Sequence, residues 1–156
     1  MRTLRRPRAQ APTRSLKTGD RPVLLATLGV PFDPDASAFA LDAAVESGQA
    51  LIVANVVEVP PMPLSVVIGY DQAGDPPELL EAIRAPAELA RSLGVRVERL
   101  RVKSLRPVEA MIELVAERDP GVLVFGPDRT KRRPRVYRKA ARAVRERAAC
   151  LVWLAP

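Results

Sequence analysis

Pro22–Leu28 has the sequence PVLLATL, a short and nearly continuous apolar run. Such a run is typical of a strand whose two sides are both covered by helices. A helix is expected soon after it, because Asp33 suits the N-cap position and Pro34 suits the first helical position. Gly48 then marks the end of that helix. The segment therefore predicts a strand followed by a helix, the first unit of a βαβ fold.

The same alternation continues along the rest of the chain. Four more apolar runs are expected to form strands, over residues 51–59, 95–102, 121–125 and 150–154. Helices are expected over residues 34–47, 77–93 and 135–148 and from Pro107 onward, with Pro86 inside the second of them. Alternating strands and helices predict an α/β fold, a doubly wound five-stranded parallel sheet with helices on both faces. Charged residues throughout 95–102 favour an edge position for that strand.

The length and the distribution of charge predict one domain with a separate tail. The chain has 156 residues, with 25 Lys and Arg against 18 Asp and Glu. Residues 1–20 carry six basic groups and lack apolar periodicity, so we expect a disordered basic tail before a domain at 21–156. Residues 60–76 are rich in proline, and we expect an irregular excursion there.

The composition excludes several kinds of site. The chain has no histidine and a single cysteine, Cys150. These counts exclude Ser-His-Asp and Cys-His catalysis, zinc sites that use histidine or four thiolates, and a disulfide within the chain. A lone cysteine suits a reducing compartment, so we expect a cytoplasmic protein. No apolar run approaches the roughly 20 residues of a membrane helix, and we expect no membrane span.

A basic segment at residues 129–147, RTKRRPRVYRKAARAVRER, is the strongest charge feature. Within its helix Arg135, Arg138, Arg142 and Arg145 fall on one face, and Val136, Ala140 and Val144 are expected to face inward. One interpretation is a solvated face that serves solubility. The other is an anion site for a phosphorylated ligand, RNA or an acidic partner. Since Tyr137 is the sole aromatic residue nearby, stacking on bases is not expected.

The C-terminal segment 146–154, ERAACLVWL, resembles the C-terminus of universal stress proteins. The run 121–125 followed by Gly126, the order of helices and strands, and the excursion after the second strand are also similar to that family. The resemblance covers residues 21–156. It implies a five-stranded parallel sheet in the order 3-2-1-4-5 and homodimers that form through the last strand, residues 150–154.

One branch of that family binds ATP, and most of its motif is absent from this chain. The Gly-x-x-Gly loop after the fourth strand keeps Gly126, but its second glycine falls on Arg129. The Gly-Ser pair that opens the following helix falls on Arg138 and Lys139, and the aspartate that ends the first strand falls on Leu28. The resemblance therefore implies a degenerate ATP site and no bound cofactor. If a phosphate ligand is kept, Gly126, Arg129, Arg138 and Lys139 are its candidate residues.

The expected function is a non-enzymatic, stress-related regulator that acts by dimerisation and by binding a protein partner. Two alternatives stay open. The protein could be a regulator that binds ATP or AMP through Arg129 and Lys139. It could also bind nucleic acid or another polyanion nonspecifically through residues 129–147, although the scarcity of aromatic residues disfavours nucleic acid.

Overall fold

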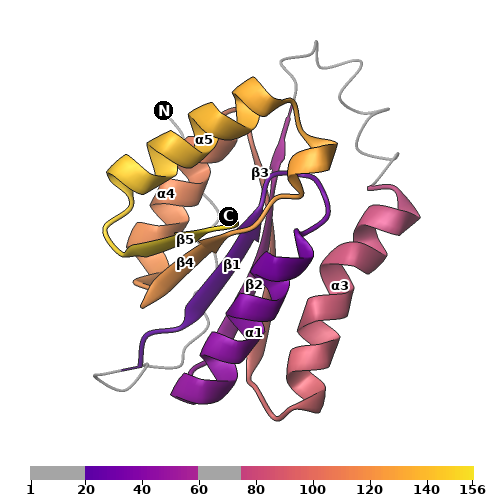
Figure 1. Ribbon diagram of the computed structural model, residues 1–156, viewed down its shortest axis with the longest axis vertical. Coiled ribbons are helices and arrows are strands. Elements are labelled where there is room, and N and C mark those ends of the chain that lie inside the picture. Colours follow the sequence, from indigo (N-terminus) through magenta and orange to yellow (C-terminus); the bar gives the residue numbers. More distant parts are fainter. Residues whose placement is uncertain (1–19, 60–74) are drawn as a thin grey trace, which may run out of the picture.

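The computed structural model describes residues 20–59 and 75–156 (Figure 1). Five parallel strands form one sheet in the order β3-β2-β1-β4-β5. In chain order the elements are β1 Val23–Thr27, α1 Pro34–Ser47, β2 Leu51–Glu58, α3 Pro77–Ser92, β3 Val97–Ser104, α4 Pro107–Arg118, β4 Val122–Phe125, a short 3-10 turn Arg129–Lys131, α5 Pro134–Arg147 and β5 Leu151–Leu154. The expected fold and strand order are confirmed. Most of the expected tail 1–20 and excursion 60–76 lies outside the described residues.

Two apolar cores lie on opposite faces of this sheet. Helices α1 and α3 cover one face, and α4 and α5 cover the other (Figure 1). All five residues of β1 are buried, as expected for a central strand that is covered on both sides. Alternate residues of β1 therefore divide between the two cores, with Leu25 facing α1 and Leu24 and Ala26 facing α4 and α5.

The charged strand β3 lies at the edge of the sheet, as its sequence predicts. It begins at Val97, two residues later than expected. The reason is that the backbone N–H of Val95 donates to the carbonyl of Ala90 at 3.0 Å, and Gly94 has a φ of +80°. Residues 94 and 95 therefore complete the end of α3 before the strand starts.

Helix α1 begins and ends at the residues that its sequence indicates. Asp33 Oδ1 accepts hydrogen bonds from the backbone N–H groups of Asp35 at 2.8 Å and Ala36 at 3.2 Å. Pro34 occupies the first helical position, and Gly48 ends the helix with a φ of 68°. These contacts satisfy helix-end groups that would otherwise lack partners.

We predict that Asp33→Ala lowers the free energy of unfolding by about 1 kcal/mol, because two N–H groups lose their acceptor. Urea denaturation of the full chain measures the change. Asp42→Ala is the control, since Asp42 is exposed within the same helix and caps nothing among the described contacts. A loss of the same size in both variants would contradict the capping role.

The buried side of α5 agrees with the expectation at Ala140 and Val144 but differs from it at Val136. Val136, expected to face inward, is 44% exposed, whereas Tyr137 is buried with Ala140, Ala141 and Val144. The Tyr137 ring packs against Phe125 at a centroid distance of 5.7 Å, and this contact rotates the buried side by about one residue. Cys150, expected in a buried strand position, is half-buried and lies just before β5.

Candidate functional site

The candidate site lies where the carboxyl ends of β1 and β4 meet. From β1 the chain continues to β2 on one side, and from β4 it continues to β5 on the other. Ligands of open α/β sheets bind in the crevice beyond such a reversal of strand order. We call the space between loop 28–34 and loop 126–134 the crevice.

Polar side chains hold the first loop in place at the floor of the crevice. The Thr27 hydroxyl donates to the Val30 carbonyl at 2.7 Å, and Asn55 Oδ1 accepts from the Gly29 N–H at 2.9 Å. Thr27 and Asn55 are both buried. Sequence reasoning missed them, although a polar residue within each apolar run, PVLLATL and LIVANVVEV, was a visible signal. Their hydrogen bonds to the loop make the floor rigid.

Gly126 lets the two loops approach each other closely. The Asp33 N–H donates to the Gly126 carbonyl at 2.8 Å, and the Gly126 N–H donates to the Ala26 carbonyl at 2.9 Å. A Cβ at this position would lie 2.8 Å from the Cβ of Ala36 and 3.2 Å from Leu25 Cδ1. Packing between β4 and the start of α1 therefore explains a glycine here without any phosphate ligand.

A short helical turn follows Gly126 in place of an open glycine loop. Asp128 Oδ1 accepts from the Thr130 N–H at 2.9 Å and from the Thr130 hydroxyl at 2.7 Å. The Asp128 N–H donates to the Pro31 carbonyl at 2.9 Å, which ties this turn to the first loop. The backbone N–H groups of Asp128 and Thr130 are thus already bonded within the protein.

Arg129, the residue at the position of the second family glycine, contacts the protein's own C-terminus. Its Nη1 donates to the Pro156 carbonyl at 3.1 Å, and its guanidinium lies 4.9 Å from the centre of the Tyr137 ring. Burial raises the pKa of Tyr137, and the positive charge of Arg129 partly opposes that shift. Arg129 stabilises this corner of the domain through a cation–π contact.

Arg132, which sequence reasoning included only as part of the basic segment 129–147, lies against the turn that follows β1. Its Nη2 donates to the Leu28 carbonyl. A Cβ placed on Gly29 would lie 3.6 Å from the same nitrogen, so the guanidinium covers the turn after β1. Its Nε is buried and has no hydrogen-bond partner among the described residues. The protein thus places one of its own cations against the backbone of Leu28, the residue onto which the resemblance puts the family aspartate.

Arg138 and Lys139 lie more than one turn inside α5, which starts at Pro134. Both are exposed on the outer surface of the helix. The resemblance placed this pair at the opening of the helix, and the structure places Arg133, Pro134 and Arg135 there instead. Among the described contacts, none joins Arg138 or Lys139 to Gly126 or Arg129. A role of these four residues in binding phosphate stays a prediction.

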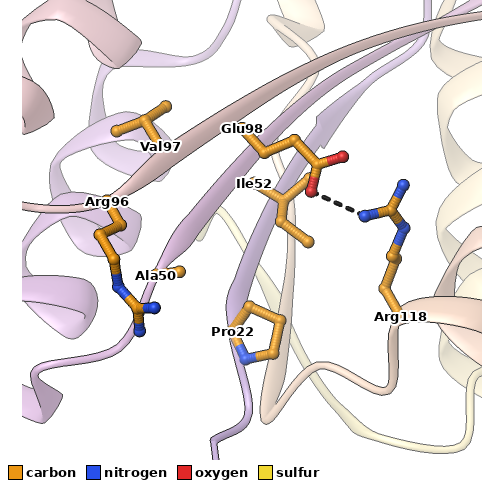
Figure 2. Close-up of a pocket in the computed structure, with 7 residues that line it drawn as sticks. All are labelled: Pro22, Ala50, Ile52, Arg96, Val97, Glu98 and Arg118. Atoms are coloured by element: carbon orange, nitrogen blue, oxygen red, sulfur yellow. Dashed lines mark hydrogen bonds and ion pairs between the residues drawn. The ribbon is translucent and has the colours of Figure 1, made fainter. Parts of the chain in front are cut away.

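Two small hollows lie near the ends of the sheet. One of about 140 Å³ lies beside Asn55 and Ile83, below the roughly 300 Å³ of small ligand pockets. The other, of about 230 Å³, lies at the opposite end, where the strands begin (Figure 2). In Figure 2 the Glu98 carboxylate points toward Arg118, and the two form an ion pair at 2.7 Å. The two charges neutralise each other, although Arg118 Nε is buried without a hydrogen-bond partner among the described residues.

The described part of the chain has neither a cluster of metal-binding side chains nor a helix that could span a membrane. Residues 20–59 and 75–156 contain no group of three or more Asp, Glu or Cys side chains placed to hold a metal ion. No helix within these same ranges is long and apolar enough to cross a membrane.

Solved structures of similar length share this fold. A universal stress protein in complex with cAMP is 24% identical, with a TM-score of 0.61, and the match covers 87% of this chain and 97% of that one. UspA from Lactobacillus plantarum is 16% identical, with a TM-score of 0.66, and the match covers 87% of this chain and 97% of that one. The universal stress protein from Archaeoglobus fulgidus in complex with dAMP is 18% identical, with a TM-score of 0.54, and the match covers 86% of this chain and 96% of that one.

A comparison of this chain with curated proteins found no match. The family model described as the universal stress protein family matches residues 21–156. The strand order that the family resemblance implied is also the order observed. The chain belongs to the universal stress protein family.

Proposed function

We propose that this protein is a non-enzymatic, stress-related regulator of the cytoplasm that acts by dimerisation and partner binding, with its crevice closed to ATP. One observation carries the proposal. Arg132 donates to the Leu28 carbonyl and covers the turn after β1, so its guanidinium lies over the part of the crevice in which open α/β sheets bind ligands. No cofactor is required by this function.

The energetic argument rests on lost contacts. Leu28 is buried and apolar, and offers no hydrogen bond to a sugar or base. Arg129 has a side chain where a phosphate loop needs bare backbone, and it is engaged with Pro156. At roughly 1–2 kcal/mol for each lost polar contact, three or four losses weaken ATP binding on the order of 10³-fold. ATP would also have to displace Arg132.

A thermal-shift panel of the full chain tests the proposal. ATP, AMP and cyclic AMP are added separately at low and at high salt. The proposal predicts no nucleotide-specific rise in melting temperature, since a ligand that does not bind the folded state cannot stabilise it. A rise that saturates with ATP and persists at high salt would overturn the proposal.

The exposed edge of β5 supports the dimerisation part of the proposal. β5 is the last strand of the sheet, and among the described strands it pairs only with β4. Its Leu151 is 76% exposed, whereas Trp153 stacks on Phe39 of α1 with the ring centres 4.7 Å apart. An unpaired strand edge with an exposed leucine favours pairing with a second chain.

We predict that Leu151→Arg converts the dimer into a monomer, because a buried and unpaired guanidinium opposes association. Sedimentation velocity on the full chain measures the mass. Leu105→Arg is the matched control, since Leu105 is 63% exposed in the connection after β3, at the other edge of the sheet. A wild-type protein that sediments as a monomer, or a Leu151→Arg dimer, would contradict this assignment of the interface.

A second candidate is a regulator that binds a nucleotide. Structures with the same fold hold cAMP and dAMP, and loop 126–134 carries Arg129, Lys131, Arg132 and Arg133. Arginines can hold phosphate directly, in a geometry different from that of a glycine loop. In the panel above, a saturable shift with AMP or cyclic AMP would favour this candidate over a closed crevice.

A further inference from the structure

The outward face of α5 carries a row of arginines. Arg135, Arg138, Arg142 and Arg145 are all exposed, and the opposite side of the helix is buried against the sheet. With a rise of 1.5 Å per residue, the row extends over roughly 15 Å. Figure 1 shows α5 as an outer helix on the face that it shares with α4. We call these four residues the arginine row.

Most of the arginine row lacks ionic partners. Arg142 pairs with Glu146 at 3.0 Å, and both side chains are exposed. Among the described residues, no ion pair involves Arg135, Arg138 or Arg145. Arg147, near the end of the helix, is instead bound to Glu109 of α4.

This arrangement opposes the stability of the helix that carries it. Like charges spaced three or four residues apart repel each other. The first turn of α5 contains no acidic residue, and Arg135 lies beside the positive end of the helix dipole. A helix selected only for stability and solubility would mix its charges. The uncompensated row therefore indicates a ligand that supplies the negative charge.

The surface chemistry favours phosphate over a protein partner. Protein interfaces depend on aromatic or apolar anchors near their centre. The exposed apolar side chains beside the row, Pro134 and Val136, lie only at its first end, where they line a hollow together with Arg135 and Arg138. Val136 lies about 100° around the helix from Arg135, and Tyr137 is buried. Guanidinium groups bind phosphate oxygens with two parallel hydrogen bonds. Because no exposed ring lies there to stack on bases, a paired duplex fits better than a single strand.

We propose that the arginine row binds the phosphate backbone of double-stranded nucleic acid without sequence preference. The rigid helix presents its guanidinium groups at fixed intervals, and the contact is made to phosphates alone. This inference is independent of the state of the crevice. Binding of this kind releases counterions, so its affinity falls steeply as salt rises.

Fluorescence anisotropy with a labelled 20-base-pair DNA duplex tests the proposal on the full chain between 50 and 200 mM salt. Arg138→Gln and Arg145→Gln are combined in one variant, since neither residue has a described ion pair and glutamine suits a helix. The plot of log affinity against log salt should become shallower by about 2 in slope, and the affinity at low salt should fall about tenfold or more.

A charge-matched control separates the row from the overall charge. Arg91 and Arg99 are exposed on α3 and β3, and changing both to Gln removes the same charge elsewhere. This control should keep the wild-type slope, and residues 1–19 are the same in all three proteins. Equal slopes in the wild type and the row variant would overturn the proposal. So would binding that survives 0.5 M salt, or poly-L-glutamate that competes as well as the duplex per unit charge.

Discussion

Replacing Gly126 with alanine is expected to lower the free energy of unfolding by about 2–3 kcal/mol. The new Cβ would lie 2.8 Å from the Cβ of Ala36 and 3.2 Å from Leu25 Cδ1. The Ala36 Cβ is attached directly to the first turn of α1 and cannot rotate away. The backbone of α1 or of the β4 end must shift instead. Urea denaturation followed by circular dichroism measures the loss.

Gly121→Ala is the matched control for this prediction. A Cβ there would lie 3.4 Å from the Cβ of Arg21, which is an ordinary contact distance. Both variants restrict the unfolded chain equally, so the difference between them reports native packing. The control should stay within about 0.5 kcal/mol of the wild type. Equal losses in both variants would refute the packing role of Gly126.

Removing Arg132 is expected to open the crevice. Under the proposed function, a nucleotide that enters the wild-type crevice must first displace the charged hydrogen bond from Arg132 to the Leu28 carbonyl. Such a bond contributes about 1.5–3 kcal/mol, so its removal corresponds to tenfold or more in affinity. Arg132→Ala should therefore bind a fluorescent ATP analogue at least about tenfold more tightly than the wild type. Anisotropy of the analogue measures both affinities.

Arg133→Ala is the control, because Arg133 is the exposed neighbour and its loss removes the same charge. It should bind the analogue no better than the wild type does. If Arg132→Ala binds more weakly than the wild type, Arg132 is itself a phosphate ligand, and the second candidate function is correct.

Much of the fold could be predicted from local sequence. The run Pro22–Leu28 indicates a strand buried on both faces, and β1 is buried throughout. Asp33, Pro34 and Gly48 mark the ends of α1 because caps depend on residue type and position alone. The strand order came from the family resemblance, and the observed sheet confirms it.

The contact that covers the turn after β1 could not be predicted in this way. Arg132 meets Leu28 across 104 positions of sequence, and nothing in its spacing marks it. Long and flexible side chains select their partners only when the fold brings loops together. The inward position of Tyr137 in place of Val136 has a similar origin, since it depends on the ring of Phe125 in another element.

The most direct test of the proposed closed crevice is calorimetric titration of ATP into the wild-type chain. The account predicts no saturable heat up to roughly 1 mM ATP, because the crevice lacks the ligands for a nucleotide and Arg132 covers the end of β1. A submicromolar dissociation constant for ATP would contradict it.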